Sequence, residues 1–481
     1  MSTKIFKTVM MLTLGLAMTA SVLFTACSEE GTGSKGSDPK PNPDDSVVVA
    51  NVGWKSNFGG RDDDYFNSVI AVPDGTVAVG YSKWSSFNTG DWEGIAGQLN
   101  ADAIIVKYDN AGNVVWKKNF GGSNDDVYYS VMAVSDGIVA VGYSAEYSFN
   151  AGDWTGITAK GGYDAVIVKY DNNGNVVWKK NFGGSSVDYY YSIVAVSDGF
   201  VAVGNSGNPS FGNGDWTGVA AKGSDVNSRD AIIVKYDKDG NVVWKKNFGG
   251  GGNDREFFES VTAVADGIVA VGYANSAYGT GDWVGVTGKG GDDAIIVKYD
   301  NAGNVLWKKN FGGGSYDYFY SVTAVSDGII AVGVSGNASF GNGDLTGITG
   351  KGSNDATIVK YDNAGNVLWK KNYGSFQFYA VFNSVIAVSD GIIAVGNDGN
   401  SSGVKASMVK FGNTGTVLSQ NTFGADIYIS NSSDNTSFNS VTATSDGIVA
   451  VGFAEKDAFG SGDWTGYTAK GYDDAIIVKY K

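Results

Sequence analysis

The 481-residue chain contains no histidine and only one cysteine, Cys27. A single cysteine excludes an internal disulfide, and the lack of histidine excludes the usual zinc ligands and any His-dependent catalytic triad. Proline is also scarce, at 5 residues, and charged residues make up 18% of the chain. We therefore expect no enzymatic activity, and the recognisable nucleophile–base pairs and glycine-rich phosphate loops are missing from the sequence as well.

Basic charge is also in short supply, because the formal net charge is −15. Such a balance argues against a nucleic-acid partner, whose phosphates require a basic face. What the chain has in quantity is glycine, at 71 residues, and aromatic residues, at 13%. This composition predicts an all-β protein with many tight turns.

The N-terminal segment resembles a bacterial lipoprotein signal peptide. Lys4 and Lys7 precede an apolar stretch that ends in LFTAC, so cleavage is expected before Cys27. Residues 1–26 would be the signal peptide, and acyl chains on Cys27 would anchor the protein to a membrane. A plain cleaved signal and an uncleaved membrane anchor are the alternatives.

Residues 27–46 are interpreted as a flexible tether, because residues 28–45 hold three of the prolines and no large apolar side chain. Glu29 and Glu30 resemble the acidic export tags of surface lipoproteins in Bacteroidota-like bacteria. The expected location is the outer membrane, with the cell surface preferred over the periplasm.

The rest of the chain is a repeat in which three strings recur in a fixed order. SVxAVxDGxxAVG, DAIIVKYD and WKKNFGG each occur seven times, some of them in degenerate copies. The anchors of the third string lie 62, 62, 66, 63, 62 and 50 residues apart, which suits a four-stranded unit.

Each unit reads as four antiparallel strands joined by Asp-Gly and DNxGN turns. Seven such units over residues 47–481 predict a seven-bladed β-propeller. The final unit supplies three strands up to Lys481, while a spare WKSNFGG stands at Trp54. We expect the N-terminal strand to pair with the last blade and close the ring.

The repeat DAxIVKYDxxGNVxWKKNFGGSxxDxxYSVxAVSDGxxAVG is similar to the bacterial SBBP-type β-propeller repeat over residues 50–481. The resemblance implies a propeller in an exported protein, and it implies no particular activity.

Long loops that connect the second and third strands carry a GDW motif. Exposed tryptophans beside aspartates could stack on sugar rings and bind their hydroxyl groups; the alternative is that each indole packs its loop against the neighbouring blade. The tryptophans considered as ligand-binding residues are Trp92, Trp154, Trp216, Trp283 and Trp464.

A second loop, between the GG pair and the first strand, carries a repeated acid. These carboxylates could ring the axis and hold a hard cation such as Ca²⁺, or present a negative opening to a cationic partner. The alternative is that they accept backbone N–H bonds in their turns. Apart from this Ca²⁺ no cofactor is expected. The acids are Asp64, Asp126, Asp188, Asp254 and Asp317.

The symmetry breaks around the sixth unit, which lacks the GDW loop at residues 397–405 and is followed by an enlarged polar loop at residues 425–439. A notch there would be a unique ligand site, flanked by Trp283 and Trp464. The alternative is a decayed repeat. The residues predicted to bind ligand are Asp426, Tyr428, Asn431 and Asp434.

The sequence thus favours a membrane-tethered, monomeric binding or scaffolding propeller that recognises a glycan or a protein. A periplasmic envelope assembly factor is the first alternative, and a glycan-degrading enzyme is the second.

Overall fold

The computed structural model describes residues 51–275, 278–374, 378–400, 403–425 and 435–481. The chain divides into two compact units, Met1–Asp45 and Ser46–Lys481, and the second contains every described residue. None of the helices in these ranges is long and apolar enough to cross a membrane.

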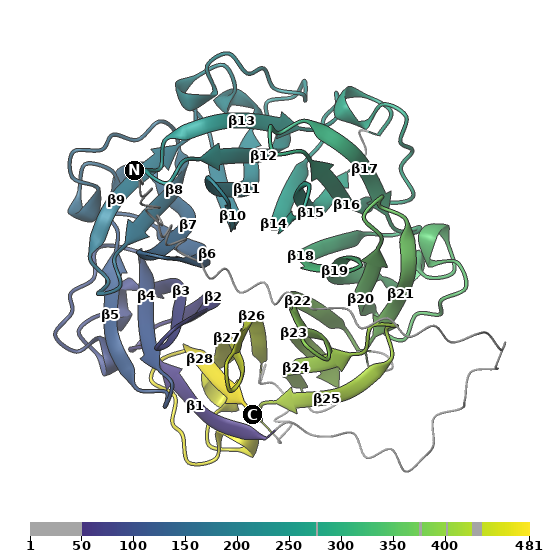
Figure 1. Ribbon diagram of the computed structural model, residues 1–481. Coiled ribbons are helices and arrows are strands. Elements are labelled where there is room, and N and C mark those ends of the chain that lie inside the picture. The colour runs from purple at the N-terminus through teal and green to yellow at the C-terminus, as the bar shows by residue number, and fades with distance from the viewer. Residues whose placement is uncertain (1–50, 276–277, 375–377, 401–402, 426–434) are drawn as a thin grey trace, which may run out of the picture. The chain divides into compact units, whose positions relative to one another are not determined.

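The second unit is an all-β, seven-bladed propeller, as the repeat predicts (Figure 1). Each blade is a four-stranded antiparallel sheet, with its first strand innermost and its fourth strand at the rim. We number blades 1 to 6 from the sheet β2–β5 to the sheet β22–β25, and blade 7 is formed by β26, β27, β28 and β1.

The strands are 7 to 10 residues long and follow one another in chain order. Their bounds are β1 Val52–Phe58, β2 Asp64–Val72, β3 Gly75–Lys83, β4 Ala101–Asp109, β5 Val114–Phe120, β6 Asp126–Val134, β7 Gly137–Ala145, β8 Tyr163–Tyr170, β9 Val176–Phe182, β10 Asp188–Val196, β11 Gly199–Gly207, β12 Arg229–Tyr236, β13 Val242–Phe248, β14 Glu256–Val264, β15 Gly267–Asn275, β16 Asp292–Tyr299, β17 Val305–Phe311, β18 Asp317–Val325, β19 Gly328–Gly336, β20 Asn354–Tyr361, β21 Val367–Tyr373, β22 Ala380–Val388, β23 Gly391–Asn400, β24 Gly403–Phe411, β25 Val417–Phe423, β26 Thr436–Thr444, β27 Gly447–Glu455 and β28 Asp473–Tyr480.

Short 3₁₀ helices shape the loops between second and third strands. They are η1 Trp84–Ser86, η2 Gly90–Trp92, η3 Glu146–Ser148, η4 Gly152–Trp154, η5 Asn208–Ser210, η6 Gly214–Trp216, η7 Gly281–Trp283, η8 Asn337–Ser339, η9 Gly343–Leu345, η10 Lys456–Ala458 and η11 Gly462–Trp464. Because the strands are antiparallel, these loops and the blade-to-blade connections share one face, the long-loop face. The Asp-Gly and DNxGN turns share the other.

The sequence explains these strands locally. Gly137 in the first turn of blade 2 has φ of 153°, and a Cβ there would lie 1.9 Å from the carbonyl oxygen of Tyr170. Only glycine fits this conformation and this approach. The third strand β8 is buried on both faces apart from its first residue, and the fourth strand β9 is half exposed.

Tryptophans of the outer strands connect neighbouring blades. The indole N–H of Trp116 in blade 1 donates to the carbonyl of Asn172 in the turn of blade 2, at 3.2 Å. Gly174 of the same turn lies against this ring, because a Cβ there would lie 3.0 Å from it. The recurrent tryptophan and glycine thus form a stacked contact between blades.

The predicted ring closure is confirmed. Strand β1 pairs antiparallel with β28, with Lys55 opposite Val478 and Phe58 opposite Ala475. Blade 7 therefore contains the first strand and the last three strands of the chain. Because β1 pairs with β28, β28 has no unpaired edge.

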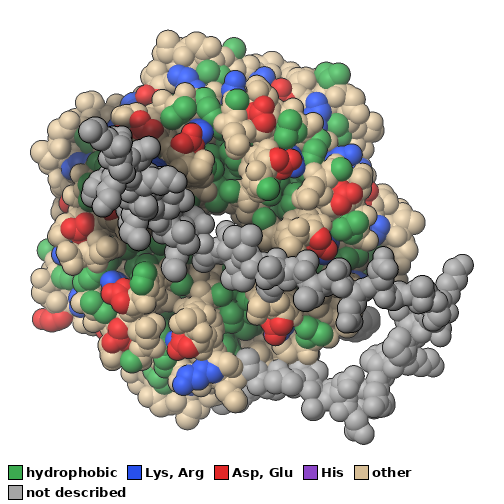
Figure 2. Space-filling model, in the orientation of Figure 1, with side chains coloured by type: hydrophobic (Ala, Val, Ile, Leu, Met, Phe, Trp, Pro, Cys, Tyr) green, Lys and Arg blue, Asp and Glu red, His purple; other side chains and the backbone are tan. Residues whose placement is uncertain are grey.

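Charges are dispersed on the face shown in Figure 2, where acidic and basic side chains are interspersed around the ring. Ion pairs also form within blades, such as Lys107 with Asp74 and Lys169 with Asp136, both at 2.7 Å. The net negative charge is therefore not gathered into one acidic patch on the part of that face that is not grey.

Candidate functional site

In blades 1, 2, 3 and 5 the aspartate that begins the inner strand is the centre of a buried hydrogen-bond network. In blade 2, Asp126 accepts a bond from the backbone N–H of Gly122 at 2.8 Å and from the indole N–H of Trp154 at 2.9 Å. Burial raises the pKa of Asp126 to about 7, although these hydrogen bonds oppose the shift. The network fixes the GDW loop to the start of β6.

The tryptophans of the GDW loops are all fully buried. Trp154 meets Phe120 of blade 1 edge-on, with ring centroids 4.9 Å apart. The expectation of exposed sugar-stacking rings is therefore wrong, and the alternative of packing against the neighbouring blade accounts for their positions. The side chains with no exposed surface are Trp92, Trp154, Trp216, Trp283 and Trp464.

The predicted acids do not form an open ring at the axis, because each is buried within its own blade. Asp64, Asp126, Asp188 and Asp317 begin their inner strands and are at most 1% exposed. Among the described residues no group of three or more His, Cys, Asp or Glu is arranged to hold a metal ion. Their geometry supports the alternative, in which they accept hydrogen bonds in turns.

The prediction that Asp254 is the repeated acid of blade 4 is wrong. Glu256 begins β14 and accepts the backbone N–H of Gly250 at 3.0 Å, so it takes the place of the repeated aspartate. The longer side chain compensates for a loop that is longer in blade 4. Burial raises the pKa of Asp254, and burial together with the charge of Asp254 raises that of Glu256.

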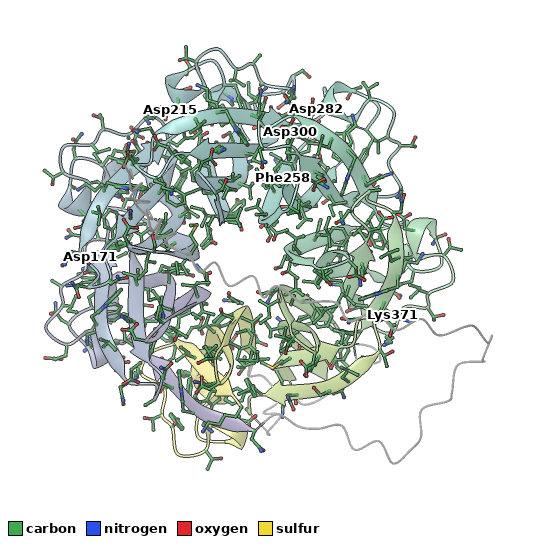
Figure 3. The ribbon with its side chains drawn as sticks, viewed as in Figure 1. Asp171, Asp215, Phe258, Asp282, Asp300 and Lys371 are labelled. Atoms are coloured by element: carbon green, nitrogen blue, oxygen red, sulfur yellow. The ribbon has the colours of Figure 1, made fainter. Side chains whose placement is uncertain are left out.

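Aspartates of the GDW motif join adjacent blades. Asp215 of blade 3 accepts the backbone N–H of Gly183 at 3.0 Å and pairs with Lys160 of blade 2. Asp282 of blade 4 pairs in the same way with Lys222 of blade 3, at 3.3 Å. Both aspartates lie toward the rim of the ring (Figure 3). These carboxylates are therefore engaged in holding the ring together.

The notch around blade 6 is only partly within the described residues. Strands β23 and β24 pair as far as Asn400 opposite Gly403, so the GDW loop is indeed replaced by a short hairpin. The four predicted ligand residues lie outside the described residues; they are Asp426, Tyr428, Asn431 and Asp434. Their role stays a prediction.

The inner strands bring tyrosines and one glutamate to the axis. Each inner strand has a register shift at one residue, and in blade 4 this residue is Glu259. Its negative charge contributes to raising the pKa of Tyr129, Tyr191 and Tyr320, which belong to three other blades. The ring centroids of Tyr129 and Tyr191 lie 5.3 Å apart, and burial raises the pKa of Glu259 to about 7.

Half-buried aromatic rings cover several seams between blades near the long-loop end of the inner strands. The ring centroids of Tyr65 and Phe453 are 4.9 Å apart across the seam of blades 7 and 1, and those of Tyr273 and Tyr318 are 4.4 Å apart across the seam of blades 4 and 5. Arg229 lies over Phe257, 6.0 Å from its centroid. This aromatic arc is an amphipathic surface suited to binding.

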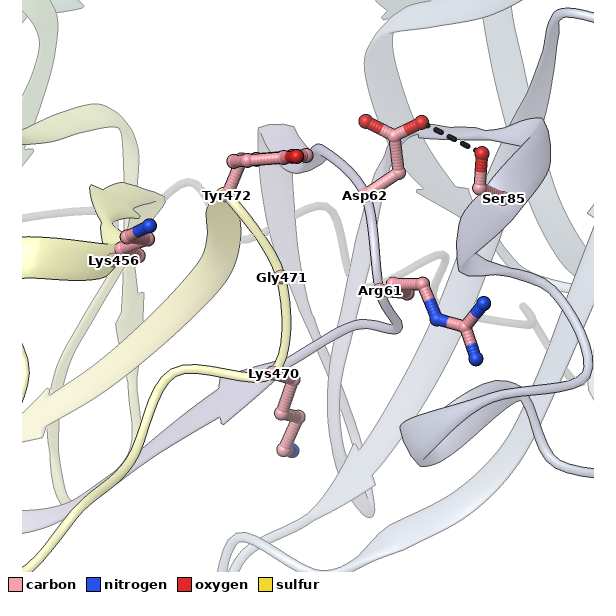
Figure 4. Close-up of a pocket in the computed structure, with 7 residues that line it drawn as sticks. All are labelled: Arg61, Asp62, Ser85, Lys456, Lys470, Gly471 and Tyr472. Carbon is pink, nitrogen blue, oxygen red and sulfur yellow. Dashed lines mark hydrogen bonds between the residues drawn. The ribbon is translucent and has the colours of Figure 1, made fainter.

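A pocket of about 360 Å³ lies on the long-loop face at the seam of blades 7 and 1 (Figure 4). We call it the seam pocket. Its lining combines basic, acidic, hydroxyl and aromatic groups within one small concave surface. The side chains that line it are Arg61, Asp62, Ser85, Lys456, Lys470 and Tyr472.

Two of the three cations in the seam pocket are not in ion pairs. Lys470 pairs with Asp91 and also donates to the carbonyl of Asn57 at 2.7 Å. Within the described ranges, no carboxylate pairs with Arg61 or Lys456, and the ammonium of Lys456 lies 5.7 Å from the ring centroid of Tyr472. An anionic group would find free donors here.

The sequence contained a signal for this pocket that the repeat analysis missed. Only three of the 35 basic residues are arginines, and all three stand at the long-loop ends of strands, at Arg61, Arg229 and Arg255. At the position of Arg61 four other blades have Ser123, Ser185, Gly251 and Gly314. Departures from a repeat, more than its recurrent residues, would have identified this site.

No protein-family model matches the chain, so the resemblance to SBBP-type repeats stays a prediction. A stretch of 230 residues, 44% of the chain, is 24% identical to the regulatory protein FlaEY of Caulobacter vibrioides, and this match covers only 23% of that protein.

Two solved structures are similar in fold. The WD40 β-propeller domain of Doa1 has a TM-score of 0.46 at 12% identity, over 90% of this chain and 97% of that one. Drosophila Plexin A, solved in complex with Semaphorin 1b, has a TM-score of 0.44 at 8% identity, over 90% and 88%. These likenesses concern the fold alone.

Proposed function

We propose that this protein is a non-enzymatic binding or scaffolding propeller that recognises a glycan or a protein partner through its long-loop face. In this proposal it is exported, anchored to the outer membrane through acylated Cys27, and displayed at the cell surface. The seven-bladed ring serves as a rigid support for the loops.

One observation carries the proposal: the long-loop face carries cations and half-buried aromatic rings that take no part in the Asp–Trp hydrogen bonds. The tryptophans of the GDW loops are buried, and in blades 1 to 3 their indole N–H groups donate to the repeated acid, as Trp154 does to Asp126. Arg61, Lys456 and exposed Tyr472 of the seam pocket, and the aromatic arc, are left for a ligand. Concave sites with a few convergent polar groups are the usual places for binding.

An array of glycans and surface proteins, probed with the unit Ser46–Lys481, tests this proposal. We expect saturable binding to at least one class of ligand, and we expect competition by the same ligand in solution. The proposal fails if the folded unit binds neither glycans nor proteins above the level of a denatured sample.

A periplasmic assembly role is the alternative for location. Protease treatment of intact cells separates the two, because a surface protein is digested and a periplasmic one is protected. A glycan hydrolase is the second alternative and normally requires two carboxyl groups that flank the scissile bond. Of the described residues that line the seam pocket, Asp62 is the only acid.

A further inference from the structure

The seam pocket differs from the other blade junctions in its residues, although the backbone around it repeats. Lys456 begins η10. The helices at the same place in four other blades, η1, η3, η5 and η8, begin with Trp84, Glu146, Asn208 and Asn337. Tyr472 precedes β28, where four other blades have Asn100, Gly162, Ser228 and Gly291. Lysine and tyrosine at these positions are not needed to form a blade, because the other blades form without them.

The pocket offers donors for an anion. The guanidinium of Arg61 can donate two parallel hydrogen bonds to a carboxylate, and Lys456 adds a second cation on the opposite side of the seam. With Lys470 neutralised by Asp91, the lining carries one net positive charge in a protein whose net charge is −15. In an acidic protein, a locally positive site attracts an anionic ligand more strongly than the rest of the surface does.

The same pocket also offers acceptors and an aromatic face. Asp62 accepts hydrogen bonds from the hydroxyl of Ser85 and the backbone N–H of Asp63, both at 3.0 Å, and each of its oxygens retains a further lone pair. Tyr472 is 63% exposed. Asp62 would repel a bare phosphate, but it would accept bonds from ligand hydroxyl groups.

We propose that the seam pocket binds an acidic sugar residue, with its carboxylate on Arg61, its hydroxyl groups on Asp62, and one face of the ring against Tyr472, while Lys456 adds positive charge beyond Tyr472. This assignment rests on the proposed binding function and names its ligand class. The ring of a uronic acid or a sialic acid combines one carboxylate, several hydroxyls and a C–H face in a single ligand, as the lining requires.

Calorimetric titration of the unit Ser46–Lys481 tests the assignment with defined probes. The acidic probes are a galacturonic acid tetrasaccharide and sialyllactose, which distinguish the two sources of the carboxylate. Their neutral counterparts are the carboxyl-reduced tetrasaccharide and lactose. We expect at least one acidic probe to bind at least about 10-fold more tightly than its neutral counterpart, as a charge-assisted bond requires.

Substitutions locate the site. Arg61→Gln should weaken binding of that probe by about 10- to 100-fold, because it removes the charge-assisted hydrogen bonds to the carboxylate, and Lys456→Gln should weaken it by about 3- to 10-fold, because it removes a neighbouring positive charge. Lys238→Gln, which removes the same charge from a turn on the opposite face, is the matched control and should leave binding unchanged. The three variants should melt at the same temperature as the wild type, because these side chains are exposed.

Three results would overturn the assignment while leaving the proposed function intact. They are equal binding of acidic and neutral probes, equal binding by wild type and Arg61→Gln, and displacement of the acidic probe by inorganic phosphate at the same concentration as by the free sugar acid. Failure to bind every glycan and protein on the array would instead overturn the proposed function itself.

Discussion

Replacing Trp154 with leucine tests whether the buried network, rather than loop sequence alone, holds the GDW loops. The indole donates to Asp126 at 2.9 Å and has no exposed surface. Loss of a hydrogen bond to a carboxylate costs about 1.5–3 kcal/mol, and the smaller side chain adds about 1–2 kcal/mol for the space it leaves. We expect Trp154→Leu to lower the free energy of unfolding by about 3–5 kcal/mol.

The chain offers matched controls for this substitution. Blade 5 naturally carries Leu345 at the tryptophan position, and there Oδ1 of Asp317 is buried without a partner among the described residues. Leu345→Trp should supply that partner and leave the melting temperature unchanged or raised. Trp84→Leu removes an indole that is 57% exposed and should have no effect.

Thermal unfolding followed by circular dichroism measures the effect. A unit of roughly 440 residues has an unfolding entropy near 0.9 kcal/mol/K, so the expected loss corresponds to about 3–5 °C. A melting temperature within about 1 °C of wild type for Trp154→Leu would refute the reasoning. Equal destabilisation by Leu345→Trp would also refute it, because the added indole would then bring no compensating bond.

Three further predictions follow from the fold, from the axis and from the N-terminus. Deletion of β1 (Val52–Phe58) leaves β28 unpaired, so the melting temperature should fall by more than it does for Trp154→Leu; an unchanged melt would contradict ring closure. The folded pKa of Glu259 is about 7, above its ordinary 4.5, so its contribution to stability is complete below pH 4.5 and is lost as the pH rises through 7. Glu259→Gln should therefore stabilise by about 1–3 kcal/mol at pH 8 and by almost nothing at pH 4, and melts with equal shifts at both pH values would exclude this account. Cys27→Ala should release the protein from the membrane fraction, and retention would indicate an uncleaved anchor.

The repeat determined the fold because every blade is encoded locally. Gly137 marks a turn that only glycine can make, the apolar run of β8 marks a strand buried on both faces, and the spare strand at Trp54 identifies the partner of β28. Local patterns of this kind are independent of the neighbouring blade.

Which side chains are free to bind was decided only by the tertiary structure. Trp154 and Asp126 are 28 residues apart in the chain, but in the fold they form a hydrogen bond and both are buried. The GDW motif, which the sequence suggested as a ligand site, is therefore structural. Arg61 and Tyr472 lie near opposite ends of the propeller's amino-acid sequence. They line the same pocket because β1 pairs with β28 and closes the ring. Burial and proximity depend on contacts between blades, and the sequence of one repeat does not contain the residues that its neighbours present to it.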